Sequence, residues 1–347
     1  MGIRIERFGS NPLFCAADIA PSRPDFTVIG VLNPGAFRWN GRIGLVLRVA
    51  EQPAADSGEL AAAVCLDGEY RLLRVRRNDP AVRCNDPRIF FYRDRACLTS
   101  ISHLLVAWSD DGGISFEPDY SLRIFPAGPY ETYGIEDCRV EFFEGRYILT
   151  YSAVSEFGVG IGTASTEDWK EFTPHRLLLH PHNKDCALLP RRVGGCAWML
   201  HRPSGIDLGG NFIWLSESAD LEHWGGPRCL AATRPGMWDS ERIGAGASPL
   251  ETDAGWLEIY HGADRNGRYS LGALLLDRNA PAHVIARSEA PLMEPASDYE
   301  MKGFYHDCIF TNGQIAEGDR LRLYYGAADS VVCGADLSVS EIIASLK

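Results

Sequence analysis

The sequence lacks the cysteine pattern of a zinc site or a disulfide scaffold. Its 10 cysteines are scattered, without C-x-x-C pairs or dense clusters. Free cysteine is often buried as a small hydrophobe, so we interpret most of them as buried thiols in a reducing cytoplasm. We also expect no metal and no cofactor, because His201, His261 and His306 share no H-x-E or H-x-x-x-H spacing.

Long apolar runs are absent as well. The first 26 residues are interrupted by six charged side chains, so no stretch resembles the apolar core of a signal peptide. No eighteen apolar residues run together elsewhere, as a membrane-spanning helix would need. We therefore expect a cytoplasmic protein without a membrane partner.

Positive charge is in short supply. The chain has 34 Lys and Arg against 46 Asp and Glu, a formal net charge of −12. Nucleic-acid and anionic-membrane binders need a basic face to displace counterions, which argues against both classes. An acidic protein that binds an anion must gather its few cations in one place.

Helical periodicity is nearly missing, apart from one stretch at Ser338–Leu346. A weak repeat of about fifty residues is present instead, and such a period is typical of propellers. The repeat units open at five polar positions: Asn33, Asp137, Asp185, Ser248 and Asp307. Each continues into a strongly apolar strand: Ile43–Ala50, Arg146–Val154, Gly195–Pro203, Gly255–Ala263 and Arg320–Ala328.

Three units carry a matching Ser/Asp turn followed by an aromatic residue, a hairpin signal, at Trp108–Phe116, Ala164–Phe172 and Ser216–Trp224. Residues 51–98 interrupt the first unit and contain a further D-P-R at Asp86–Arg88, so a sixth unit is the competing interpretation. We favour five. The prediction is one all-β domain over residues 1–347, a five-bladed β-propeller with a central active-site pocket, an N-terminal extension at 1–30 and an insertion at 51–98.

A propeller brings the residues that open each repeat to one central pocket. Four basic side chains fall near these positions: Lys184, Arg202, Arg242 and His261. Arg offers a planar fork of donors and Lys a compact charge, which suits phosphate, although a carboxylate substrate would also fit. The alternative for each residue alone is an ion pair, or for a histidine a core hydrogen bond, that joins neighbouring strands.

Sugar chemistry needs an acid for the leaving oxygen and a nucleophile on the opposite face of the ring. Asp137 is our candidate acid, and phosphate as nucleophile removes the need for a second carboxylate. We expect Tyr133 and Tyr305 to stack on sugar rings. The polar residues Asp185 and His306 complete the predicted substrate contacts from the opening segments.

Five segments carry a family resemblance: Y-G-I-E-D-C-R at Tyr133–Arg139, N-K-D-C-A-L-L-P at Asn183–Pro190, R-I-G-A-G-A-S-P at Arg242–Pro249, G-W-L-E-I-Y-H-G at Gly255–Gly262 and Y-Y-G-A-A-D at Tyr324–Asp329. Together they resemble glycoside hydrolase family 130, the β-mannoside phosphorylases and β-1,2-mannosidases. The segment Phe304–Gly313 looks most like members acting on β-1,2-mannobiose or short oligomannosides. In the family's E-D-P-R motif, Cys138 here replaces the usual proline.

The resemblance implies that Asp137 is the general acid, and that its proton passes through a mannose hydroxyl with inversion to α-mannose 1-phosphate. It implies that Asn33, Arg48 and Asp329 hold the mannose. Basic residues at all four phosphate positions imply phosphorolysis, with inorganic phosphate as co-substrate of an oligosaccharide. An inverting mannosidase that uses water, a sugar-binding propeller without catalysis, and a propeller hydrolase with several carboxylates remain alternatives. Linkage, acceptor and a homo-oligomeric state stay open.

Overall fold

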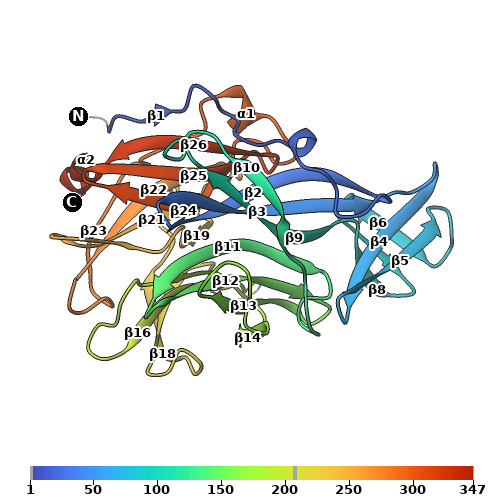
Figure 1. The fold of residues 1–347 in the computed structure, drawn as a ribbon, viewed down its shortest axis with the longest axis horizontal. Helices are drawn as coiled ribbons and strands as arrows, with labels where there is room; N and C mark the ends of the chain where they lie inside the picture. Colours follow the sequence, from blue (N-terminus) through green and yellow to red (C-terminus); the bar gives the residue numbers. More distant parts are fainter. Residues whose placement is uncertain (1–2, 206–208, 347) are drawn as a thin grey trace.

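The computed structural model describes residues 3–205 and 209–346. Residues 1, 2, 206–208 and 347, which belong to the predicted domain 1–347, lie outside the described residues. Almost all regular structure is β (Figure 1). The described helices are a 3₁₀ turn at Ala16–Asp18, α1 at Asp298–Met301 and α2 at Val339–Ser345, and none of them is long and apolar enough to cross a membrane.

Among the described residues, the strands outside the insertion form one 12-stranded, one 5-stranded and one 4-stranded sheet. Two single parallel bridges divide the 12-stranded sheet into three antiparallel groups, so that five antiparallel groups can be distinguished along the chain. The first contains β2 (Phe26–Trp39), β3 (Arg42–Pro53), β9 (Ile101–Ser109) and β10 (Glu117–Ile124). The second contains β11 (Gly134–Phe143), β12 (Arg146–Ser155), β13 (Gly158–Thr166) and β14 (Arg176–Leu179). The third contains β15 (Asn183–Leu188), β16 (Ala197–Pro203), β17 (Ile213–Ser218) and β18 (Gly225–Ala231).

In the fourth group, β19 (Arg242–Gly244) and β20 (Leu250–Thr252) both pair with β21 (Gly255–Ala263), followed by β22 (Tyr269–Leu276) and β23 (Val284–Arg287). The fifth contains β24 (Ile309–Glu317), β25 (Arg320–Ala327), β26 (Val331–Ser338) and β1 (Glu6–Arg7) from the other end of the chain. Single parallel bridges, Gly35 to Asn312 and Gly134 to Ser102, connect the fifth, first and second groups.

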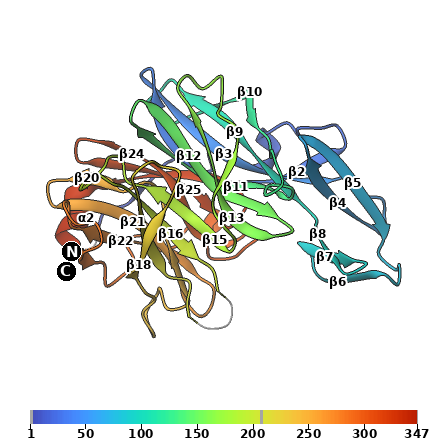
Figure 2. The ribbon, with the colours of Figure 1, turned by 90° about the horizontal axis from the view of Figure 1, so that it is seen from below.

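The insertion forms two small sheets of its own. One pairs β4 (Glu59–Leu66) with β5 (Glu69–Arg76), and the other contains β6 (Val82–Asp86), β7 (Ile89–Tyr92) and β8 (Arg95–Leu98). These strands project to one side of the molecule in two perpendicular views (Figures 1 and 2). The first group continues past them, because β3 pairs directly with β9.

The second strand of each group is buried because both of its faces pack between neighbouring groups. All nine residues of β21 are buried, for example. Between the first and second groups, the Phe37 ring stacks on Trp169 with centroids 3.7 Å apart. Continuous apolar runs are what strands buried on both faces require, so the predicted second strands are confirmed within a few residues.

The Ser/Asp turns have one shared cause. At Ser109, Thr166 and Ser218 the hydroxyl accepts a backbone N–H three or four residues later. The aspartate two residues further on accepts two more backbone N–H groups, as Asp220 does from Glu222 and His223. Short polar side chains that hydrogen-bond their own backbone favour turns over strands, so this sequence pattern ends the third strand in these three units.

Candidate functional site

A repeated backbone device aims polar side chains at one place. Asn33, Asp137 and Asp185 have positive φ, between 32° and 55°, and each lies at a register shift in the innermost strand of its group. Asn and Asp tolerate this left-handed conformation better than other side chains, and a bulge re-aims the side chain that it carries. Asp307, just before β24, has φ 51°.

The fourth group departs from this pattern, and the assignment of Ser248 as its opening residue was wrong. Its inner strand begins at Arg242, and Ser248 lies between β19 and β20, near the opposite end. Gly244 and Gly246 replace the left-handed aspartate there, because a Cβ on Gly244 would lie 2.2 Å from Asp185 Oδ2. Because Gly244 has no side chain, Asp185 of the third group can approach this strand closely.

Asp137 is 4% exposed and is held by two neighbours from the first group. Its Oδ1 accepts from Asn33 Nδ2 at 2.9 Å and from Arg48 Nη1 at 3.0 Å. The same guanidinium donates to Glu136 Oε1 at 2.7 Å. Three of the residues that we expected in the pocket, Asn33, Arg48 and Asp137, are therefore in direct contact.

The charge state of this cluster follows from its surroundings. Burial would raise the pKa of Asp137, but Arg48, Lys184 and Arg139 outweigh it and lower the pKa below the usual value. Asp329, within electrostatic range of the same groups, has its pKa raised by burial and by the Asp137 charge, against the opposing effect of Arg48. The two carboxyls therefore differ, with the proton favoured on Asp329.

A second cluster surrounds Asp185, which is 1% exposed. Arg202 Nη1 lies 2.8 Å from Asp185 Oδ2, and His261 Nε2 lies 3.3 Å from the same oxygen. Burial raises the pKa of Asp185, but Arg202, His261 and Arg139 together lower it well below its usual range. Burial lowers the pKa of His261 to about 4, so the imidazole is neutral at pH 7.

Arg202 retains hydrogen-bonding capacity in this cluster. Its Nε is buried and has no hydrogen-bond partner among the described residues. A buried donor without a partner costs free energy.

Arg139 joins the two clusters, and sequence reasoning assigned it no role in the site. Its guanidinium donates to the carbonyls of Asp137 (2.8 Å), Ala245 (2.7 Å) and Gly246 (2.9 Å). Nη2 also lies 3.5 Å from Asp185 Oδ1. Its place in the D-C-R segment was the available signal. Every residue has a backbone carbonyl, so the acceptors of Arg139 cannot be recognised from the residue types in the sequence.

Arg242 and Tyr305 border the Asp185 cluster through Tyr269. The Arg242 guanidinium lies 6.0 Å from the centre of the Tyr269 ring, and Tyr305 packs edge-on against that ring at 5.7 Å. Burial raises the pKa of Tyr269 to about 12, while Arg242 and Arg202 act in the opposite direction. Arg242 is exposed, whereas Arg202 is buried.

Three histidine and tyrosine positions lie apart from these contacts. The Tyr133 hydroxyl donates to the Ala96 carbonyl of the insertion at 3.0 Å. His306 is exposed, with Nδ1 3.4 Å from the Met301 carbonyl. His201 contacts Asn183 Oδ1 and Ser216 Oγ, so it makes core hydrogen bonds within the third group.

The insertion contributes a residue that we had not assigned to the site. Arg88, at the turn between β6 and β7, pairs with Asp86 and lies within electrostatic range of Asp329 and Tyr305. Its D-P-R segment was read as a competing repeat unit instead. No group of three or more His, Cys, Asp and Glu side chains suited to a metal ion occurs in residues 3–205 and 209–346.

The site thus combines a buried carboxyl, that of Asp137, with the buried cations Arg139 and Arg202. The family profile described as beta-1,4-mannooligosaccharide phosphorylase matches residues 75–347. A beta-1,2-mannobiose phosphorylase from Listeria innocua is 39% identical over 99% of both chains. A 1,2-beta-oligomannan phosphorylase from Thermoanaerobacter is 34% identical over 61% of this chain and 71% of its own. The chain belongs to glycoside hydrolase family 130.

Solved structures agree with this assignment. The Listeria innocua beta-1,2-mannobiose phosphorylase in complex with beta-1,2-mannobiose superposes with a TM-score of 0.93 over 99% of both chains, at 39% identity. A structure described with the family's hydrolases that target beta-1,2 mannosidic linkages in Candida mannan has a TM-score of 0.73 at 21% identity, covering 97% of this chain and 94% of the other. That second likeness supports the fold alone.

Proposed function

We propose that this chain cleaves β-1,2-mannobiose with inorganic phosphate and releases mannose and α-mannose 1-phosphate. The observation that supports the proposal is that Asp137 lies within electrostatic range of Lys184, and that Arg139 contacts both Asp137 and Asp185, which pairs with Arg202. The full-length similarity to a named β-1,2-mannobiose phosphorylase supports the choice of substrate.

In this proposal Asn33, Arg48 and Asp329 hold the mannose whose bond is cleaved, and Asp137 supplies the proton. Lys184, Arg202, Arg242 and His261 bind phosphate. Asp185 and His261 are buried against Arg202 and fix its direction. Tyr133, Tyr305 and His306 line the approach of the second sugar.

The reaction moves one proton and exchanges one bond. The C1 to oxygen bond of the mannoside breaks, the leaving oxygen takes the proton that originates at Asp137, and a phosphate oxygen bonds to C1 from the opposite face. The proton that hydrogen phosphate loses on becoming the sugar ester replaces the one taken from Asp137, so atoms and charge balance.

Lys184 connects phosphate binding to that proton, because it helps keep Asp137 ionised. Phosphate bound at Lys184 would offset this charge and raise the pKa of Asp137. Binding of phosphate thus favours the protonated form of Asp137, which is the form that can act as the acid.

The same proposal includes the finer architecture. The five antiparallel groups are taken as the blades of one β-propeller domain, with residues 51–98 as an insertion in the first blade. The 10 cysteines are all free thiols, which supports a reducing cytoplasmic location. A homo-oligomer remains a prediction.

The test is to incubate the purified protein with β-1,2-mannobiose with and without phosphate and to quantify both products. We expect mannose 1-phosphate and mannose in equal amounts, and no cleavage without phosphate. Asp137→Asn should lower the rate of cleavage by a factor of about 10² to 10⁴, and Asp253→Asn, the same change at an exposed position, is the matched control. Phosphate-independent release of mannose would instead identify a hydrolase.

A further inference from the structure

The inner chain of the fourth group leaves its partner strand between β19 and β20. Gly244 pairs with His261 on one side of the gap, and Leu250 pairs with Leu257 on the other. Residues 245–249 of the inner chain therefore lie opposite a shorter stretch of β21, and their backbone groups cannot all join the ladder. Those that are buried need other hydrogen-bond partners.

Glu258 is the partner of one of these backbone groups. It is fully buried on β21, and its Oε1 accepts from the Gly246 N–H at 2.8 Å. The neighbours on the same face of the strand, Trp256 and Tyr260, belong to an apolar cluster that includes residues of the third group. Burying a carboxyl in such a cluster costs free energy, so packing does not account for a glutamate here.

The Glu258 carboxyl is neutral at pH 7. Burial raises its pKa well above the usual range, and the Gly246 N–H and Arg139 oppose this effect only in part. Its Oε2 is buried without a hydrogen-bond partner among the described residues. An ionised carboxylate with an unpaired oxygen would cost far more than the neutral acid, which still offers Oε1 as an acceptor.

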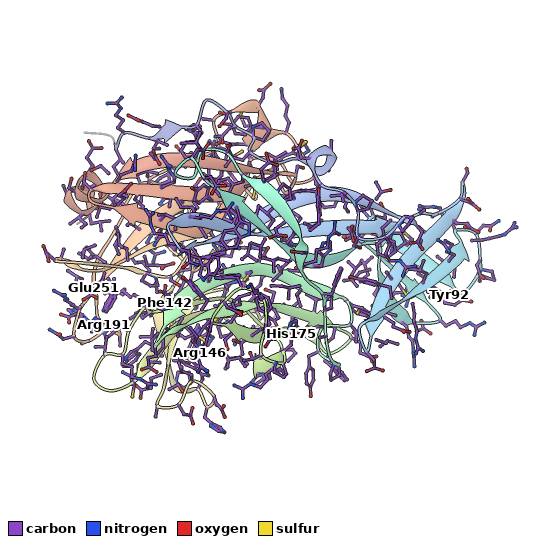
Figure 3. All side chains as sticks on the ribbon, in the orientation of Figure 1. Tyr92, Phe142, Arg146, His175, Arg191 and Glu251 are labelled. Carbon is purple, nitrogen blue, oxygen red and sulfur yellow. The ribbon has the colours of Figure 1, made fainter. Side chains whose placement is uncertain are left out.

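Glu251 of the same group is an ion-pairing glutamate by contrast. In Figure 3 it lies near Arg191, on the opposite side of the molecule from Tyr92. Its Oε1 is 2.6 Å from Arg191 Nη2 and 2.7 Å from Arg278 Nη2. Partly exposed ion pairs of this kind contribute modestly to stability, so Glu251 serves as a structural comparison for Glu258.

The Gly246 N–H belongs to the same peptide group as the Ala245 carbonyl. In a trans peptide such as this one, the N–H and the carbonyl point in opposite directions. The N–H points to Glu258, and the carbonyl accepts from Arg139 Nη2 at 2.7 Å. If the peptide rotated by half a turn, its N–H would face the guanidinium, which has donors only. The hydrogen bond to Glu258 thus holds the orientation in which the carbonyl can accept.

Arg139 connects this peptide to both clusters of the site. Its Nη1 donates to the Asp137 carbonyl at 2.8 Å, and its Nη2 lies 3.5 Å from Asp185 Oδ1. Asp137 has φ 55°, and such a left-handed conformation persists only where surrounding contacts hold it. The direction of Arg139 therefore affects the backbone that aims the Asp137 carboxyl and the carboxylate that holds Arg202.

We propose that Glu258 is a positioning residue: as a neutral acceptor it fixes the peptide that directs Arg139, and Arg139 in turn orients Asp137 for the reaction. The inference rests on the proposed function, and it adds a side chain that acts through Arg139 instead of touching sugar or phosphate. Sequence analysis placed Glu258 in the family segment Gly255–Gly262 without assigning it a role.

The test replaces Glu258 in the full chain by Met and by Gln. Methionine is unbranched and fills an apolar cluster, but it offers the Gly246 N–H only a weak acceptor, whereas the glutamine amide oxygen can still accept. We expect Glu258→Met to lower kcat/KM for phosphate by roughly 10- to 100-fold, the range for a weakened hydrogen bond to a charged group, with the Kd of mannobiose unchanged. Glu258→Gln should restore the wild-type value. Glu251→Met is the matched control and should keep wild-type kinetics, even if its Tm falls.

Crystal structures of the two Glu258 variants give a readout that does not require turnover. In Glu258→Met the peptide between Ala245 and Gly246 should be rotated or displaced away from Arg139, and in Glu258→Gln it should stay as in wild type. An unmoved peptide in Glu258→Met overturns the proposal. Phosphate-independent cleavage by wild type would instead refute the proposed function and leave this structural comparison intact.

Three kinetic results would also overturn the proposal. Wild-type kinetics in Glu258→Met with a lowered Tm would leave Glu258 a structural role only. Equal losses in Glu258→Met and Glu258→Gln would mean that a negative charge matters, not a neutral acceptor. An equal loss of mannobiose binding would indicate a general distortion of the site.

Glu258→Gln decides the question if Glu258→Met does not fold. Wild-type kinetics, with the glutamine oxygen on the Gly246 N–H in its crystal structure, would support the neutral acceptor. A loss of roughly 10-fold or more in kcat/KM for phosphate would overturn it.

Discussion

Protonation of His201 should measurably destabilise the fold in mild acid. The ring is 4% exposed between Asn183 and Ser216, and burial lowers its pKa from 6.5 to about 4. The unfolded chain binds this proton below pH 6.5, whereas the folded chain binds it only near pH 4. The imidazole therefore contributes stability above pH 6.5 that is lost as the pH falls toward 4.

The size of the effect follows from the shift. Each pKa unit corresponds to about 1.4 kcal/mol, so lowering the pH from 7 to 5 removes about 2 kcal/mol from the free energy of unfolding through this residue. Glu141 and Glu258 have raised pKa values and act in the opposite direction, so the wild-type profile alone does not isolate His201. The difference between wild type and His201→Gln does.

The assay is urea denaturation of wild type, His201→Gln and the exposed control His283→Gln at pH 7 and pH 5. The stability advantage of wild type over His201→Gln should shrink by about 2 kcal/mol at the lower pH. An advantage that is the same at both pH values would refute the reasoning, because it would mean that His201 has the same pKa in the folded and unfolded chains.

The remaining predictions concern the site. Asp137→Asn should lower turnover by a factor of about 10² to 10⁴, with mannobiose binding retained in calorimetry; lost binding would point to a structural role. Arg202→Ala and Arg242→Ala should raise the phosphate KM by roughly 10- to 100-fold, the loss of a charged hydrogen bond, and an equal rise for mannobiose would contradict the assignment. Gly244→Ala should cost about 1–3 kcal/mol in thermal unfolding and weaken phosphate use, because its Cβ would displace Asp185; unchanged kinetics would argue against that contact. EDTA should leave turnover unchanged, and inhibition reversed by added metal would overturn the expectation of a metal-free site.

Continuous apolar runs made the second strands the most predictable part of the fold. The run Gly255–Ala263 coincides with β21, and Arg320–Ala328 exceeds β25 by one residue. The helix expected in Ser338–Leu346 is α2, whereas the four-residue α1 left no periodic signal. A strand that is buried on both faces has a continuous apolar run in its own sequence, so it can be predicted without knowing which strands it pairs with.

Interactions between groups were harder to predict. The contacts of Arg139 go to backbone carbonyls of the fourth group, and any residue type can supply those. Ser248 was misplaced because the fourth inner strand is interrupted and has no left-handed aspartate to mark its start. The polar positions Asn33, Asp137 and Asp185 could be found, since each needs a side chain that tolerates positive φ.

The pairing of β1 with β26 has a consequence for how the chain folds. β1 can pair only after β26 has been synthesised, and Gly35 likewise can pair only after Asn312 has been synthesised. On the ribosome, β1 and Gly35 must remain without these contacts until β24 and β26 have been synthesised. Closure of such distant ends is slow relative to local hairpin formation, so the amino-terminal residues are exposed longest to proteases and to incorrect pairing.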